Sequence, residues 1–296
     1  MAEAGATAFR LNASHLDADR LAAALADLGR ACPGAPVVVD LQGAKMRVAL
    51  PAPRDVAAGA RVTLAPRGEA DLVVPHAELF AQARRGDTLS LDDGRILLEV
   101  VAATAGGIEA RVACGGHLLP NKGINVVQHP VRLDRLTARD AAACEAAARH
   151  DAGALAFSFM LDGTEAAWLR ALSPRSLVVG KIERADALPQ LDALARRVDA
   201  AWICRGDLGV QLGPAGLARF VAGFDPARLP VPVLMAGQVL EHLVRHAEPT
   251  RSEVCHLFDL AARGYAGIVL SDETAIGDDP VRAVSTAAAL LDAFRR

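Results

Sequence analysis

The stretch that decides the fold covers residues 177–209 and reads LVVGKIERADALPQLDALARRVDAAWICRGDLG. It contains two short apolar runs, 177–182 and 201–204, which are typical of buried strands. Between them, residues 188–197 carry apolar side chains at the spacing of a helix. A strand, a helix and a second strand in this order predict two neighbouring parallel strands.

Charged residues follow both apolar runs. Lys181 and Glu183 close the first run, and Asp207 follows the second. Because the carboxyl ends of parallel strands open onto the ligand crevice, we expect these three side chains to face one site. Carboxylate oxygens suit Mg²⁺ or Mn²⁺, so Glu183 and Asp207 are candidate ligands of one divalent ion, with Lys181 facing the charge that the ion helps to hold. The alternative is a set of surface salt bridges, which stabilise proteins only weakly.

The same alternation of strand and helix extends over most of the chain. Further strands are expected at residues 37–40, 154–158, 231–235 and 267–270, and further helices at 16–31, 137–150 and 281–294. This rhythm predicts an α/β fold with a parallel sheet, most simply a (β/α) barrel formed by residues 1–47 and 121–296. Residues 48–120 differ, because they combine short strands with many Gly and Pro turn signals, and they predict a small all-β domain inserted in a barrel loop.

The composition excludes several classes of function. Of 296 residues, 52% are hydrophobic and 23% charged, and the net charge is -3. That balance gives no basis for binding nucleic acid or an anionic membrane surface, and no apolar run reaches the roughly 20 residues of a membrane span. Five scattered cysteines without a CxxC pair suit a reducing compartment, so we expect a cytoplasmic protein.

Seven segments carry a resemblance to a known family. They are RLNASH at 10–15, DLQGAKMR at 40–47, KGIN at 122–125, KIE at 181–183, RGDLG at 205–209, PTRSEV at 249–254 and LSDETAIGDDPVRAV at 270–284. With these segments in the family's order around a β insertion, the chain resembles the pyruvate kinase family over most of its length. The resemblance implies a TIM-type barrel with the inserted β domain acting as a lid, and phosphoryl transfer between phosphoenolpyruvate and ADP with Mg²⁺.

The resemblance also implies roles for individual residues. The catalytic residues would be Lys181, Arg10 and Ser271. Substrate would be bound by Arg10, Ser158, Lys181, Gly206, Asp207 and Gly237. Nucleotide would be bound by Asn12, His15, Arg47, Asp93 and Lys122. Phosphoryl transfer depends on positioning and on neutralisation of charge, which is why a divalent ion and a lysine are the expected parts.

Two residues depart from the family pattern near the site. Lys45 stands where many members have Glu, and Leu41 replaces a Thr that helps to bind potassium. Members with this lysine are of the potassium-independent type, so we expect its amine to replace K⁺ among Asn12, Ser14 and Asp40. A surface lysine is the alternative.

Gly237 replaces a Thr that contacts substrate and assists protonation of enolpyruvate. Its loss would slow the proton step, because general acid assistance is worth about 10²–10⁴ in rate. Alternatively, Gly237 makes room for a different enol phosphate or 2-oxo acid, a reading that Asp272 in place of the family's glycine also favours.

The chain also departs from the family at both ends. It begins at the family's second barrel strand and stops after the last barrel helix, so the first strand and the C-terminal regulatory domain are expected to be absent. The strands at 8–11 and 267–270 would then either pair directly, giving seven strands, or leave a seam that a homo-oligomer or another partner chain covers. A catalytically weak binding or regulatory subunit is therefore a third possibility beside a minimal kinase and a divergent enzyme.

Overall fold

The computed structural model describes residues 1–92 and 94–294, which form two compact units. The first unit comprises Met1–Gln42, Arg135–Leu208 and the chain from Ala215 onward, and the second comprises Gly43–Asp134 and Gly209–Pro214. The second unit is therefore wider than the predicted insertion at 48–120.

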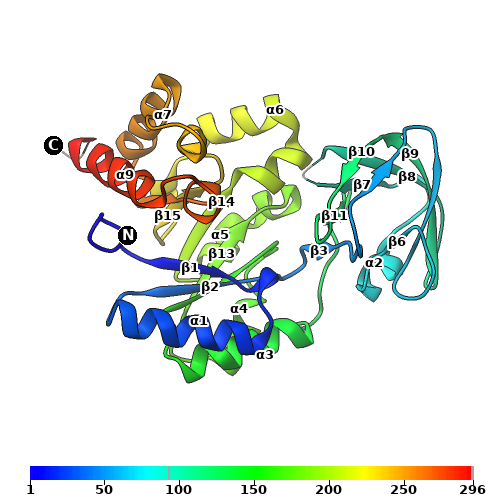
Figure 1. Ribbon diagram of the computed structural model, residues 1–296, viewed down its shortest axis with the longest axis horizontal. Helices are drawn as coiled ribbons and strands as arrows, with labels where there is room; N and C mark the ends of the chain where they lie inside the picture. Colours follow the sequence, from blue (N-terminus) through cyan, green and yellow to red (C-terminus); the bar gives the residue numbers. More distant parts are fainter. Residues whose placement is uncertain (93, 295–296) are drawn as a thin grey trace. The chain divides into compact units, whose positions relative to one another are not determined.

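The first unit is built on a parallel sheet of seven strands (Figure 1). In spatial order the strands are β1 (Phe9–Asn12), β2 (Val37–Leu41), β12 (Ala154–Phe157), β13 (Leu177–Ile182), β14 (Ala200–Cys204), β15 (Val233–Ala236) and β16 (Gly267–Val269). Every predicted strand of this unit is present, and β13 has the predicted bounds. β12 is buried along its whole length and β13 along all but its first residue, as expected for strands in the middle of a parallel sheet.

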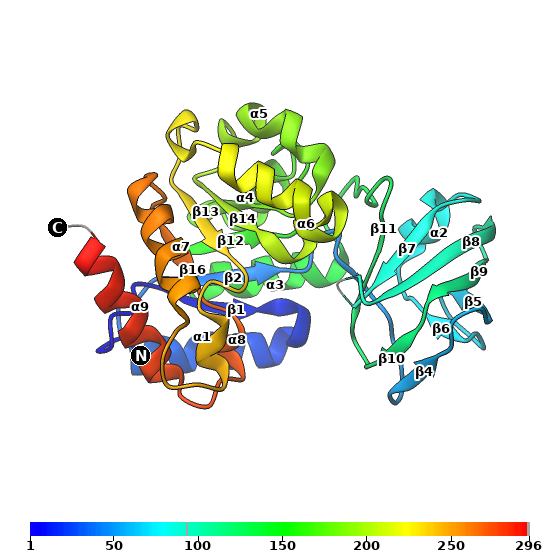
Figure 2. The same ribbon diagram turned by 90° about the horizontal axis from the view of Figure 1, so that it is seen from above.

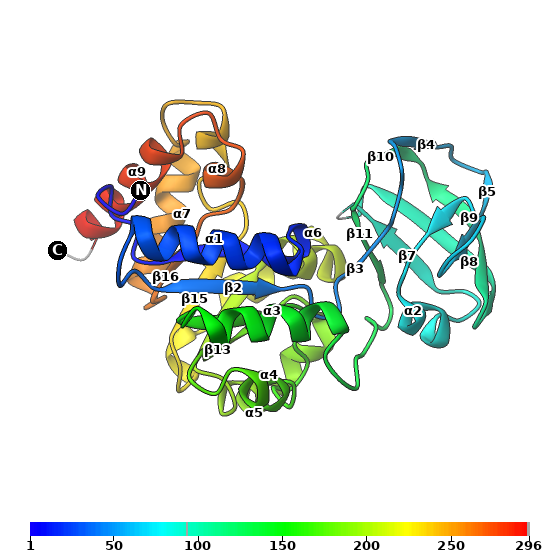
Figure 3. The same cartoon turned by 60° about the horizontal axis from the view of Figure 1, so that its bottom comes forward.

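Helices connect these strands in the α/β manner, and Figure 3 shows α1 and α3 side by side. The helices of this unit are α1 (Ala18–Ala31), α3 (Ala138–Arg149), α4 (Ala166–Leu172), α5 (Leu191–Ala195), α6 (Arg205–Gly223, of which Gly209–Pro214 belong to the second unit), α7 (Arg251–Ala262), α8 (Asp272–Ala275) and α9 (Pro280–Phe294). Short 3-10 turns are η1 (Ala13–His15), η2 (Ala185–Gln190), η3 (Pro226–Arg228) and η4 (Glu241–Val244). Local chemistry explains the helix starts: Asp17 caps α1 by accepting from the Arg20 N–H, and Thr250 and Glu253 form a capping box at α7.

The helix α6 begins directly after β14, so the RGDLG segment is the first turn of a helix and not the end of a strand. The helix is kinked at Gly213, which has a left-handed backbone (φ 68°) and is followed by Pro214. A proline at that place removes a backbone donor and interrupts the helix.

The two ends of the seven-stranded sheet do not pair with each other among the described residues, because β1 pairs only with β2 and β16 only with β15. The expected direct pairing of these strands is therefore not found. Their residues are all partly exposed, in contrast to the buried strands between them. The N-terminal segment instead runs beside α9, where a Cβ at Gly5 would lie 2.6 Å from the Cβ of Ala288.

The second unit is mainly antiparallel, and Figure 2 shows its two long strands β8 and β9 side by side. Its larger sheet contains, in spatial order, β3 (Met46–Arg47), β11 (Gly123–Val126), β7 (Thr88–Leu91), β8 (Ile96–Thr104), β9 (Gly107–Cys114), β5 (Arg61–Ala65) and β6 (Leu72–Val73). A small sheet pairs β10 (Gly116–Leu118) with β4 (Arg54–Val56). One helix, α2 (Ala77–Gln82), departs from the all-β expectation: its Leu79 and Phe80 are buried in the core of this unit, so tertiary packing stabilises a helix among turn signals.

No helix in the described part of the chain has both the length and the apolar character needed to cross a membrane.

Candidate active site

Five polar side chains from four adjacent strands form a connected cluster at the carboxyl-end side of the first unit's sheet. Asp40 is the second-last residue of β2, Ser158 follows β12, and Lys181 and Glu183 lie at the end of β13. Arg10 extends from β1. Four of these residues were predicted to bind substrate or metal, and their side chains contact one another directly or through Asp40.

Lys181 is at the centre of this cluster. Its Nζ lies 3.0 Å from Asp40 Oδ1, 2.8 Å from Ser158 Oγ and 3.0 Å from Glu183 Oε1. An ammonium group has three donors, and these three acceptors can use all of them. The relative exposure of Lys181 is 6%, so the contacts form away from bulk water.

Asp40 links Lys181 to a second cation. One of its oxygens, Oδ2, accepts from Arg10 Nε at 2.7 Å and lies 2.5 Å from Arg10 Nη2. Asp40 was predicted to lie beside the amine of Lys45, and its contacts with Arg10 and Lys181 were not predicted. No local pattern reveals these contacts, because they join strands that are up to 141 residues apart along the chain.

The charges of the cluster balance, with two cations and two carboxylates. Burial alone would raise the pKa of Asp40, but the attraction of Lys181 and Arg10 outweighs it and lowers that pKa below its usual value. Burial alone would lower the pKa of Lys181, but the attraction of Asp40 and Glu183 outweighs it and raises that pKa above its ordinary value. Both groups are therefore charged at neutral pH.

Ser158 and Glu183 are oriented by the backbone. Ser158 Oγ donates to the Leu41 carbonyl at 2.8 Å, and Glu183 Oε2 accepts from the Phe159 N–H at 2.9 Å. Phe159 has a left-handed backbone (φ 58°), which is uncommon for a side chain of this size. The turn after β12 is thus fixed by the same carboxylate that contacts Lys181.

The second predicted metal ligand, Asp207, lies in the first turn of α6 and is half-buried, next to the exposed Gly206. Within residues 1–92 and 94–294, no three or more His, Cys, Asp or Glu residues gather as a metal site. An ion bound by Glu183 and Asp207 would need further oxygen ligands besides these two carboxylates. The donor set fits Mg²⁺, which prefers one or two carboxylates together with phosphate and water oxygens.

A second group of polar contacts surrounds the turn after β15. Arg205 donates to the carbonyls of Gly237 and Gln238, and the fully buried Glu273 accepts from the Ser271 and Leu240 N–H groups. Roles were predicted for Gly237 and Ser271 but not for Arg205 or Glu273. The signal for these two residues is their place inside family-like segments, since a side chain that binds mainly backbone groups leaves no pattern of its own.

The residues predicted to bind nucleotide lie in both units. In the first unit, Asn12 Oδ1 accepts from the Ser14 N–H at 3.0 Å and so caps η1, which ends at the exposed His15. In the second, Arg47 Nη1 donates to the Asn121 carbonyl at 2.7 Å.

Lys122 lies 2.7 Å from Asp92 Oδ1. Asp92 is itself buried and has a left-handed backbone (φ 48°). The predicted Asp93 lies outside the described residues. Lys45 belongs to the second unit, and its predicted place among Asn12, Ser14 and Asp40 stays a prediction.

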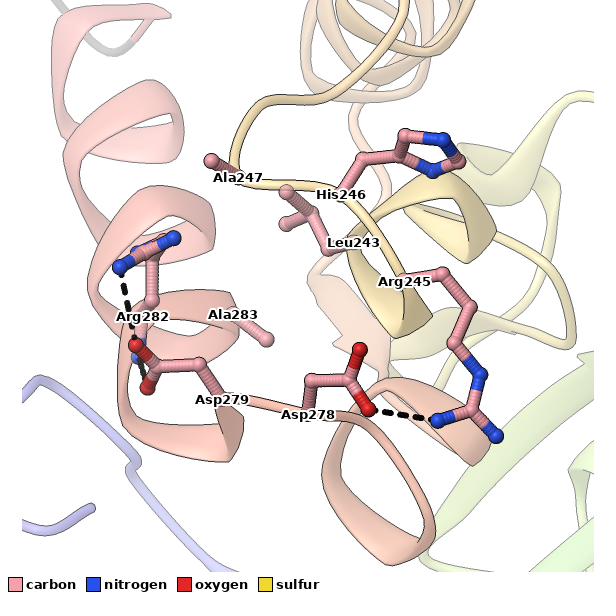
Figure 4. A pocket seen from close by; sticks show the side chains of 8 residues that line it. All are labelled: Leu243, Arg245, His246, Ala247, Asp278, Asp279, Arg282 and Ala283. Carbon is pink, nitrogen blue, oxygen red and sulfur yellow. Dashed lines mark hydrogen bonds and ion pairs between the residues drawn. The ribbon is translucent and has the colours of Figure 1, made fainter.

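A separate cavity of about 200 Å³ lies between the loop after η4 and the start of α9 (Figure 4). Its apolar lining includes Leu243, and its rim carries the ion pairs Arg245–Asp278 and Arg282–Asp279. These charges neutralise each other, and the cavity contains none of the predicted site residues.

Comparison with known proteins identifies the relatives of this chain. A family model described as "Pyruvate kinase, barrel domain" matches residues 1–284. The chain is 30% identical to a pyruvate kinase of Agrobacterium vitis, over 98% of this chain and 64% of the relative. It is also 30% identical to a pyruvate kinase of Methylorubrum extorquens, over 96% and 62%, and 31% identical to one of Thermococcus litoralis, over 84% and 55%. The chain thus spans less than two thirds of the length of these relatives.

Proposed function

The chain belongs to the pyruvate kinase family, and from this membership and the Lys181 cluster we propose that it transfers a phosphoryl group between phosphoenolpyruvate and ADP. The observation that carries the proposal is the buried ammonium of Lys181, held by Asp40, Ser158 and Glu183 at adjacent strand ends. A fixed cation in a site of low dielectric stabilises developing negative charge without reorganising during the reaction.

In this proposal the phosphoryl group leaves the enol oxygen of phosphoenolpyruvate and joins a terminal oxygen of ADP. Lys181 stabilises the charge on the phosphoryl group in transfer and on the enolate oxygen left behind. Arg10 and Ser158 bind the phosphate, and the backbone at Gly206 approaches the substrate carboxylate because glycine has no Cβ. Mg²⁺ or Mn²⁺, held by Glu183 and Asp207, would supply further neutralisation of phosphate charge.

The nucleotide would be bound by residues of both units. We assign this role to Asn12, His15, Arg47 and Lys122, with the second unit acting as a lid over the nucleotide. Lys45 would stand in for potassium, so the reaction would need no monovalent cation.

One observation favours a second candidate, a divergent enzyme that acts on another enol phosphate or 2-oxo acid. Gly237 has φ +85°. Residues with a side chain rarely adopt this conformation, and β-branched residues such as threonine adopt it least of all. A threonine at this position would therefore be strained. We infer that glycine is kept here for its backbone conformation, and that the space left by the missing side chain would suit a different substrate.

A coupled assay that measures pyruvate formed from phosphoenolpyruvate and ADP, with Mg²⁺ and without potassium, tests the proposal. We expect turnover by the wild type and none by Lys181→Met, with the two proteins giving the same circular dichroism spectrum. Undiminished turnover in Lys181→Met would remove that lysine from the mechanism. If the wild type is silent, the same assay format with other enol phosphates tests the second candidate.

A further inference from the structure

The turn formed by residues 237–240, directly after β15, has an unusual backbone. Gly237 and Gln238 are two successive residues with positive φ, +85° and +51°. A left-handed conformation is unfavourable for a non-glycine residue and persists only where the surroundings impose it. Two side chains, Arg205 and Glu273, hold this turn.

Arg205 holds the beginning of the turn. Its Nε donates to the Gly237 carbonyl at 2.9 Å, and its Nη2 donates to the same oxygen at 2.5 Å and to the Gln238 carbonyl at 2.8 Å. The opposite nitrogen, Nη1, lies 2.8 Å from His256 Nε2. A planar guanidinium fixed on both sides in this way sets the orientation of both carbonyl groups.

Glu273 holds the end of the turn. Its side chain is fully buried, and its two oxygens act on two different segments: Oε1 accepts from the Leu240 N–H at 3.1 Å and Oε2 from the Ser271 N–H at 2.7 Å. Bonds from backbone N–H groups to a carboxylate are charge-assisted and therefore stronger than those to a neutral acceptor. One carboxylate thus links the turn after β15 to Ser271, in the segment between β16 and α8.

We propose that Glu273 is a positioning residue that sets Ser271 against the 237–240 turn for the proton-transfer step. This inference rests on the proposed function and adds one step to it: enolpyruvate gains a proton after phosphoryl transfer, and Ser271, which sequence resemblance suggested as catalytic, belongs to the proton path. Glu273 does not touch substrate. It acts through the Ser271 and Leu240 backbones, with Arg205 fixing the other half of the same turn.

The test compares two substitutions that remove the same kind of contact. Glu273→Gln keeps the size of the side chain but puts an amide donor where a backbone N–H already points. Glu253→Gln is the matched control, since Glu253 also accepts from two backbone N–H groups, those of His242 at 2.9 Å and Thr250 at 2.7 Å, in the capping box of α7. Both variants lose one charge-assisted bond to backbone, but only the first loses it at Ser271.

We expect Glu273→Gln to lower kcat by about 10–100-fold with little change in KM for phosphoenolpyruvate, as a displacement near 1 Å can do. Its solvent deuterium isotope effect should also rise, because the proton step becomes slower than phosphoryl transfer. Amide exchange at Leu240 and Ser271 should be faster than in the wild type. Glu253→Gln should lower the melting temperature while kcat, the isotope effect and these two amides stay as in the wild type.

Three results would overturn the positioning role of Glu273. Equal losses of kcat in the two variants, or an unchanged isotope effect in Glu273→Gln, would overturn the positioning role while the proposed function stands. An inactive wild type would overturn the proposed function and the role with it. If Glu273→Gln does not fold, Glu273→Asp keeps the charge on a shorter side chain, and the same readouts apply.

Discussion

Replacing Asp40 by asparagine tests the charge balance of the Lys181 cluster. Asp40 is 1% exposed and has contacts of 2.5–3.2 Å to Arg10 and Lys181. Asp40→Asn keeps the shape but leaves two cations, the buried Lys181 and the partly exposed Arg10, with one carboxylate, Glu183. Removing one partner of a buried ion pair costs about 3–5 kcal/mol.

That loss converts to a lower melting temperature. With about 2–4 °C for each kcal/mol in a protein of this size class, Asp40→Asn should melt roughly 6–20 °C below the wild type. Turnover should fall as well, because Lys181 loses the negative charge of one of its three acceptors. Calorimetry and the coupled assay measure the two effects on the same preparation.

The difference in stability between the wild type and Asp40→Asn should depend on pH. The pKa of Asp40 is lowered by folding, so its contribution is fully present above the unfolded pKa, about 3.9, and is lost as the pH falls through the lower folded value. The gap in stability between wild type and Asp40→Asn should therefore be constant near neutral pH and narrow in acid. A gap that widens as the pH falls would refute the electrostatic explanation.

A double-mutant cycle with Lys181→Met provides the control. Removing the anion and one cation together restores the balance of one cation, Arg10, with one carboxylate, Glu183. We expect Asp40→Asn/Lys181→Met to be less destabilised than the sum of the two single variants. Additive losses would mean that the contacts between Asp40 and Lys181 contribute nothing through their charges.

Three further predictions concern Lys45, Gly237 and the open sheet edges. Activity should be the same with and without KCl at constant ionic strength if Lys45 replaces potassium, and a large activation by KCl would exclude that role. Gly237→Thr should lower the free energy of unfolding by roughly 1–3 kcal/mol, measured by urea titration, because the side chain is strained at φ +85°; a stabilised variant would contradict this. Light scattering over a dilution series should show that the chains associate at high concentration and separate on dilution, since the outer edges of β1 and β16 have no strand partner in the described chain. A monomer at every concentration would contradict pairing of these edges between chains.

Sequence patterns predicted the strands well, because strands that are buried on both faces read as continuous apolar runs. β13 is the clearest case, with its ends marked by a serine and by Glu183. α6 was missed, since Gly206, Gly209, Gly213 and Pro214 all disfavour helix, and the helix forms in spite of them. The kink at Gly213 is where these helix-breaking residues interrupt the regular helix.

Only part of the candidate site could be predicted from the sequence. The grouping of Lys181 with Glu183 could be predicted, because the two residues are two positions apart at the end of one strand. The place of Asp40 does not, since it depends on which strands are neighbours and on how far the Arg10 side chain reaches. Glu273 was least visible, because a carboxylate that accepts only from backbone N–H groups has no partner side chain to reveal it.

The contacts of Lys181 also explain why the cluster contains two carboxylates. All three donors of the ammonium face protein acceptors, so a substrate phosphate can bind to it only by replacing one of them. Asp40 is held in place by Arg10, and Ser158 is held by the Leu41 carbonyl. Glu183 is also held, through its Oε2 and the Phe159 N–H, but its Oε1 faces Lys181 and has a second proposed use as a ligand of the divalent ion. The arrangement therefore keeps Lys181 charged and buried before substrate arrives, while leaving one of its three positions open to exchange.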